Sequence, residues 1–128
     1  MRIPSDIKHI RKASVEIEKF LKSHEIGDSL IFDIRLCAEE AIKNAIIHGN
    51  NNNRDLSVSV AYSLEGNKFT LEVEDEGKGF TPGEVPDPTR EENLLKAGGR
   101  GVFIIQKLMD EVKYNSSGNK TFMVKFIR

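Results

Sequence analysis

The stretch "EEAIKNAIIHGN", residues 39–50, places a carboxylate, an amide and an imidazole at regular spacing. Glu40, Asn44 and His48 are four residues apart, so on a helix they form one polar stripe. Apolar residues fill another stripe, which is typical of a helix that packs on a core. The polar stripe is either a ligand-binding face or a solvated face with a Glu–Asn hydrogen bond.

A second stretch, "VEDEGKGF" at residues 73–80, ends a strand pattern with an acidic residue. Asp75 closes the strand, and Gly77 and Gly79 follow two and four residues later. Glycine adopts positive φ and lets backbone approach a ligand closely. A carboxylate at the end of a buried strand can accept a hydrogen bond from an exocyclic amine. The alternative interpretation is a turn punctuated by glycines.

A third stretch, "AGGRGVFIIQKL" at residues 97–108, brings glycines to the start of a helical pattern. Gly98, Gly99 and Gly101 precede or open this helix, whose first amides are unpaired donors at the positive end of the helix dipole. Such a terminus can cradle a phosphate, and Arg100 adds a positive charge. The alternative is a glycine-rich hinge. The stretch is neither a Walker A loop nor a Rossmann fingerprint after a strand.

Hydrophobic periodicity predicts the elements that must position these stretches. Helical spacing predicts three helices: residues 5–24 with Ser5 as N-cap, residues 28–48 with Asp28 as N-cap, and residues 102–109. Alternation of apolar and polar residues predicts a hairpin around "EGN" and two further strands near the end of the chain. Residues 77–99 are rich in glycine, proline and charge, which predicts a long loop of the kind that is usually functional or mobile. Helices combined with antiparallel strands favour an α+β two-layer sandwich.

Composition limits the classes of function. The chain has 128 residues, 38% hydrophobic and 30% charged, which fits one globular domain. The net charge of −1 gives no general attraction to nucleic acid or to anionic membranes. Cys37 is the only cysteine, which excludes an internal disulfide, and its apolar setting predicts a buried, inert thiol. We expect a cytoplasmic protein, because neither an apolar run of about 20 residues nor a signal peptide occurs.

The order of the three stretches resembles a known architecture. A Glu-x-x-x-Asn helix, Asp-x-Gly-x-Gly after a strand and Gly-x-Gly opening a helix are together the pattern of the Bergerat-fold, or GHKL, ATP-binding domain. Within that superfamily the chain is most similar to the bacterial anti-sigma-factor serine kinases (RsbW-like). The resemblance implies a single histidine-kinase-like ATPase domain over residues 1–128. Its fold would be an α+β two-layer sandwich, with helices on one face of a mixed, mainly antiparallel sheet.

The resemblance also implies a role for each matching residue. Glu40 would be the catalytic general base, in preference to its neighbour Glu39. Asn44 would hold Mg²⁺ against the phosphates of ATP. Asp75 would accept a hydrogen bond from the adenine amino group. The other nucleotide contacts would come from the glycine loops, from a lid over about residues 81–101 and from the last strand: Gly77, Gly79, Gly99, Arg100, Gly101 and Thr121.

Two positions stay open at this point. The family has a Gly-Thr pair at the start of the last strand, with the threonine helping to hold adenine. Here the region reads "SGNKTF", so either Lys120 or Thr121 could take that place. His48 matches the family pattern, and it could cap the helix beneath the nucleotide or contact the nucleotide directly.

For function, the resemblance implies an ATP- and Mg²⁺-dependent protein serine kinase that phosphorylates a serine of a STAS-domain anti-anti-sigma protein. The same surface would alternately sequester a sigma factor, so phosphorylation would switch partners and regulate transcription. Such kinases are typically homodimers, and neither nucleic acid nor a membrane is an expected direct partner. The main alternative is an ATP-binding module that sequesters a partner other than a sigma factor, with little or no kinase activity. A detached ATPase domain of another superfamily branch is the third interpretation.

Overall fold

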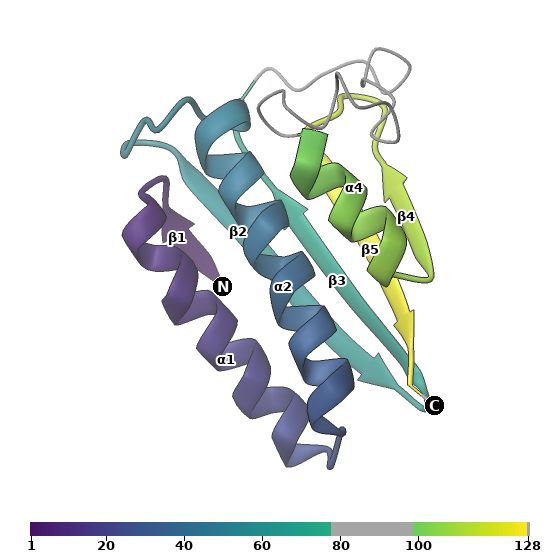
Figure 1. Ribbon diagram of the computed structural model, residues 1–128. Coiled ribbons are helices and arrows are strands. Elements are labelled where there is room, and N and C mark those ends of the chain that lie inside the picture. The colour runs from purple at the N-terminus through teal and green to yellow at the C-terminus, as the bar shows by residue number, and fades with distance from the viewer. Residues whose placement is uncertain (78–98, 128) are drawn as a thin grey trace.

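The computed structural model describes residues 1–77 and 99–127, which form two layers. Helices α1 (Ile10–Ser23), α2 (Asp28–Asn44) and α4 (Gly99–Leu108) lie over the same face of a five-stranded sheet (Figure 1). This arrangement confirms the predicted α+β two-layer sandwich with helices on one face. In this part of the chain, no helix combines the length and the apolar composition that crossing a bilayer requires.

The sheet has the strand order β1-β2-β3-β5-β4, and each of its described pairs is antiparallel, so this sheet is not the mixed one that was predicted. Its strands are β1 (Arg2–Pro4), β2 (Ser57–Glu65), β3 (Lys68–Glu74), β4 (Glu111–Tyr114) and β5 (Lys120–Phe126). Strands β2 and β3 form the predicted hairpin, and Gly66 at its tip has φ +60°, a conformation that favours glycine. Because β3 is the central strand, its carboxyl end has neighbouring strands on both sides.

One apolar core fills the space between the layers. The stripe that faces the sheet on α2 and on the segment after it (residues 45–49) is almost fully buried, and so are the inward residues of β2 and β3: Ile34, Ala38, Ile42, Ile46, Val58, Val60, Phe69, Leu71 and Val73. Burying a large apolar side chain contributes about 1.5–3 kcal/mol, so this contact fixes the position of α2 on the sheet. Cys37 belongs to the same core, and burial raises the pKa of its thiol to about 12, as expected of an inert cysteine.

The first helix begins differently from the prediction. A 3₁₀ turn, η1 (Ile7–His9), precedes α1, and Asp6 caps it by accepting from the backbone N–H of Lys8 at 3.1 Å. Ser5 is not the cap: it is buried, and its hydroxyl donates to the carbonyl of Leu56 at 2.8 Å. Both short polar residues suit an N-cap, and Ser5 is committed to the start of the sheet instead.

The second helix is not one α-helix from residue 28 to residue 48. Gly27 is its N-cap, α2 ends at Asn44, and the next segment, η2 (Ala45–Gly49), is a π-helix. The backbone N–H of Asn50 donates to the carbonyl of Ala45, five residues back, at 2.8 Å. The apolar spacing predicted a continuous helix because the wider turn depends on contacts beyond the helix itself.

Candidate functional site

Two predicted site residues of α2 face the first turn of α4. Glu40 and Asn44 lie one helical turn apart, and both lie against Gly101, which is buried. A Cβ placed on Gly101 would lie 2.8 Å from Glu40 Oε2 and 2.9 Å from Asn44 Nδ2. Glycine therefore allows α4 to begin this close to the two side chains. The structure brings the first and third stretches of the sequence together at this point.

The carboxylate of Glu40 is also held by Lys43, a residue that the sequence analysis did not single out. Lys43 Nζ lies 3.2 Å from Glu40 Oε2 and 3.4 Å from Glu40 Oε1. The Glu40 side chain is only 15% exposed, whereas that of Lys43 is 46% exposed. An ion pair with one exposed end, here Lys43, contributes little to stability. We therefore interpret it as a contact that orients the Glu40 carboxylate.

Glu39, the neighbouring carboxylate, is held on the opposite side of α2. Its Oε1 lies 3.6 Å from Arg35 Nη2. Arg35 in turn donates to the hydroxyl of Ser14 at 2.8 Å and lies 3.3 Å from Glu18 Oε1, both on α1. Glu39 therefore faces α1, whereas Glu40 faces α4 and Asn44. Of the two carboxylates, Glu40 is the one that lies with Asn44 beside Gly101.

Asp75 lies directly after β3 and is 9% exposed. Its side chain lies against Gly49 and Gly77. Its Oδ1 accepts from the backbone N–H of Gly77 at 2.8 Å, and among the described residues no group donates to its Oδ2. A Cβ on Gly49 would overlap the Asp75 carboxylate, and one on Gly77 would overlap the carbonyl of Gly49. The end of η2 and the turn after β3 can therefore meet here only because Gly49 and Gly77 lack a side chain.

The electrostatic setting of Asp75 suits a hydrogen-bond donor. Burial raises the pKa of the Asp75 carboxyl above its usual range, the Gly77 N–H opposes this shift, and Glu74 adds to it. Because no donor within residues 1–77 and 99–127 reaches the second oxygen of this sheltered carboxylate, a ligand that brings an N–H group would bind favourably there. An exocyclic amine is such a ligand.

The register between β3 and β5 separates Lys120 from Thr121. Val73 pairs with Thr121, and Glu74 pairs with Lys120. Paired residues of antiparallel strands lie on the same face of a sheet. Val73 is buried beneath the helices, so Thr121 lies on the face that carries Asp75 and Lys120 lies on the other face. Of the two residues, Thr121 is the one on the side of the candidate site.

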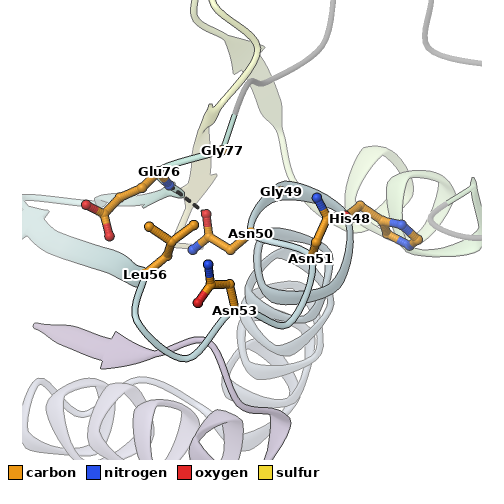
Figure 2. Close-up of a pocket in the computed structure, with 8 residues that line it drawn as sticks. All are labelled: His48, Gly49, Asn50, Asn51, Asn53, Leu56, Glu76 and Gly77. Atoms are coloured by element: carbon orange, nitrogen blue, oxygen red, sulfur yellow. Dashed lines mark hydrogen bonds between the residues drawn. The ribbon is translucent and has the colours of Figure 1, made fainter.

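A hollow of about 650 Å³ lies beside the Asp75 turn, between the end of η2 and the start of β2 (Figure 2). Its lining residues are His48, Gly49, Asn50, Asn51, Asn53, Leu56, Glu76 and Gly77. The His48 ring is exposed and points away from the Asn50 side chain (Figure 2). His48 itself lies in the π-helix, four residues after Asn44.

The remaining predicted positions fall into two groups. Gly99 and Arg100 already belong to α4, which begins three residues before the predicted start at residue 102, and Arg100 is exposed. Gly79 and the predicted lid up to residue 98 lie outside the described residues.

A buried amide was missed by the sequence analysis. Asn50 ends the first stretch of the sequence and was given no role there, yet it is 2% exposed and bonded to three segments. Nothing in residue type separates it from the three asparagines that follow. Its only local signal is its position between a helix end and a strand start.

Comparison with known proteins decides the family. The pattern of the family described as histidine kinase-like ATPase domain matches residues 3–125. The chain belongs to this family. The match includes all three stretches discussed above and confirms the predicted histidine-kinase-like ATPase fold.

Two relatives that resemble the chain along its length carry the same name. Serine-protein kinase RsbW of Oceanobacillus iheyensis is 25% identical over 134 residues, which cover 99% of this chain and 85% of that protein. Serine-protein kinase RsbW of Staphylococcus aureus is 26% identical over 136 residues, which cover 100% of this chain and 86% of that protein. The predicted resemblance to RsbW-like kinases is confirmed.

A solved structure of the family shares the fold. The histidine kinase domain of a blue-light activated histidine kinase from Erythrobacter litoralis superposes with a TM-score of 0.54 and 21% identity. The superposition covers 77% of this chain, which spans 45% of that one. At this identity the likeness concerns the arrangement of helices and strands alone.

Proposed function

We propose that this histidine kinase-like ATPase is a cytoplasmic, ATP-dependent protein serine kinase and anti-sigma factor. The observation that carries the proposal is the convergence of Glu40, Asn44 and Gly101 at one place, with the buried Asp75 at the other end of η2. The relatives named serine-protein kinase RsbW support protein serine as the acceptor class.

Adenine recognition falls to Asp75. Its Oδ2, which no described residue occupies, accepts the hydrogen bond of the exocyclic amine. Gly49 and Gly77 leave the carboxylate accessible because a side chain at either position would fill the space around it. Thr121, on the same face of the sheet, supplies a hydroxyl near the base. Gly99, Arg100 and Gly101 contribute the positive end of α4 to the phosphates.

The residues present fit a Mg²⁺ ion. The Asn44 carboxamide makes no hydrogen bond within the described residues, and its oxygen is a ligand type that Mg²⁺ accepts. Mg²⁺ usually completes its shell with water and substrate phosphates, so one protein oxygen is a sufficient anchor. Bound there, the ion supplies charge neutralisation for the transferring phosphoryl group.

Glu40 takes the proton in the transfer step. The acceptor serine oxygen forms a bond to the γ-phosphorus, the bond from that phosphorus to the β,γ-bridging oxygen breaks, and ADP leaves. The proton of the serine hydroxyl passes to Glu40 Oε2, the oxygen that faces Gly101. Lys43 keeps this carboxylate in one orientation before the substrate arrives.

The partners follow from the RsbW-like resemblance. The acceptor is a serine of a STAS-domain anti-anti-sigma protein, and a sigma factor is held alternately by a homodimer of the kinase. Phosphorylation of the antagonist ends its hold on the kinase, which then returns to the sigma factor and represses transcription.

The decisive experiment measures transfer of γ-phosphate label from Mg²⁺·ATP to a purified STAS protein encoded by the same genome. Glu40→Gln should lower the transfer rate by about 10²–10⁴-fold, the usual value of general base catalysis, while ATP still binds. Glu39→Gln is the matched control, since Glu39 pairs with Arg35 on the other side of α2 and should keep its transfer rate.

The outcomes separate the proposal from its alternative. Labelling of a STAS protein that Glu40→Gln abolishes and Glu39→Gln preserves supports the kinase. ATP binding without labelling of any STAS protein from that genome refutes the kinase and indicates an ATP-gated sequestering module instead.

A further inference from the structure

The Asn50 side chain is the most completely bonded buried amide at the candidate site. Its Nδ2 donates to Ser5 Oγ at 2.8 Å and to the carbonyl of Ser57 at 3.0 Å. Its Oδ1 accepts from the backbone N–H of Glu76 at 2.8 Å, the dashed contact in Figure 2. Both N–H groups and the oxygen are therefore used, in a setting where an unmet polar group would cost free energy.

These bonds connect four segments that are far apart in the sequence. Ser5 follows β1, Asn50 follows η2, Ser57 begins β2, and Glu76 lies one residue after Asp75. The Glu76 carboxylate also accepts from the backbone N–H of Ser57, which ties the same turn a second time to β2. Asn50 is thus the link between the helix that carries the candidate base and the turn that carries Asp75.

The position of Asp75 depends on this link. The backbone N–H of Gly77 bonds to Asp75 Oδ1, and Asn50 holds the residue between them, Glu76. On the other side, the carboxylate lies directly against Gly49, the residue before Asn50. A shift of the Asn50 amide would therefore move the Asp75 turn relative to the end of the helix, while leaving Glu40 and Asn44 on α2.

We propose that Asn50 is a positioning residue for base selectivity, which holds the Asp75 carboxylate where it can accept from an exocyclic amine. The inference rests on the proposed recognition of adenine by Asp75 and extends it to a residue outside the three stretches. The amide is required because only a group with two N–H donors and an oxygen meets Ser5, Ser57 and Glu76 at once.

The test compares the affinity for ATP with that for ITP, which carries a carbonyl where ATP carries the amine. Titration calorimetry with Mg²⁺ gives both Kd values and their ratio. The wild-type protein should prefer ATP by about tenfold or more, the usual value of a hydrogen bond to a charged group. Asn50→Asp keeps the shape but presents an acceptor to the Ser57 carbonyl, so the ATP preference should fall about tenfold while ITP affinity stays close to wild type.

Two further variants complete the experiment. Asn52→Asp is the matched control, because it makes the same change at an exposed residue that does not line the hollow, and it should keep the wild-type ratio. Ser5→Ala removes the hydroxyl that accepts from the Asn50 amide. The Leu56 carbonyl loses that hydroxyl as a donor but still accepts from the backbone N–H of residue 5. This variant should reduce the ATP preference by a smaller factor, and it decides the question if Asn50→Asp does not fold.

The results distinguish this inference from the proposed function. A wild-type protein that binds ATP and ITP equally refutes adenine recognition by Asp75 and the inference with it. A wild-type preference that survives in folded Asn50→Asp, or in Ser5→Ala where that variant alone folds, refutes the positioning role only. Equal weakening of ATP and ITP also refutes it, since that result indicates a general loss of structure.

Discussion

Replacing Gly101 by alanine should uncouple stability from catalysis. Gly101 lies in the first turn of α4, where alanine would normally stabilise the helix by about 0.5–1 kcal/mol. Here the added methyl group would lie 2.8 Å from Glu40 Oε2 and 2.9 Å from Asn44 Nδ2. Ordinary contacts are about 3.5–4.0 Å, so each polar group must move by about 0.7 Å or α4 must tilt away.

Helix propensity and overpacking change the free energy of unfolding in opposite directions. Only overpacking displaces the site residues. Overpacking costs about 1–3 kcal/mol, which the helix propensity partly offsets, so the free energy of unfolding should fall by about 2 kcal/mol at most. A displacement approaching 1 Å at a reacting group costs about 10²-fold in rate. We therefore expect a folded Gly101→Ala protein whose phosphoryl transfer is about 100-fold slower.

The assay is single-turnover transfer of γ-phosphate label to the STAS protein, with urea unfolding measured on the same preparations. Gly27→Ala is the control, because a Cβ there meets nothing within 4 Å, and it should leave the transfer rate unchanged. Wild-type transfer by a folded Gly101→Ala protein would show that α4 does not lie against Glu40 and Asn44 during the reaction.

Three more predictions follow from other contacts. Asp75→Asn should be more stable than wild type at pH 7. Burial raises the pKa of Asp75, so the stability that the protonated carboxyl gives at low pH is lost as the pH rises from the usual range of an aspartate through the raised pKa. In urea unfolding the difference should therefore shrink as the pH falls toward 4, and the ATP affinity of the variant should be about tenfold or more below wild type. Lys43→Met should slow transfer about tenfold and change the free energy of unfolding by less than about 0.5 kcal/mol. Lys43→Arg keeps the charge and should be closer to wild type in rate. A loss of stability without a change in rate would contradict the orienting role of Lys43. Gly49→Ala should lower the free energy of unfolding by about 1–3 kcal/mol and weaken ATP binding in calorimetry, because the added methyl group would overlap the Asp75 carboxylate. Wild-type stability together with wild-type ATP affinity would contradict the packing of Gly49 on Asp75.

The candidate site could be predicted where a residue type and its spacing carry the signal. Glu40 and Asn44 are one turn apart on any helix, and Asp75 ends a strand whose alternation is clear. Side-chain direction on these elements follows from periods of 3.6 and 2, so their approximate placement needs no tertiary information. The hairpin and the two-layer class were predictable for the same reason.

Other features depend on contacts that no local pattern encodes. Ser5 and Asp6 are equally good caps by type, and strand pairing assigns them different partners. Asn50 is the first of four identical residues, and its burial arises only where β1, β2 and the Asp75 turn meet. Lys43 looks like any solvated helix residue until the rotation of Glu40 toward α4 is known.

The π-helix after Asn44 limits how the length of this segment can vary among relatives. Five residues, Ala45 to Gly49, separate Asn44 from the buried Asn50. Each residue of an α-helix turns the chain by about 100°, so loss or gain of one residue here would rotate Asn50 out of contact with Ser5 and Glu76. Alignments of related chains should therefore place gaps after Asn50, in the exposed asparagines, and a deletion scan should tolerate length changes there but not in residues 45–49.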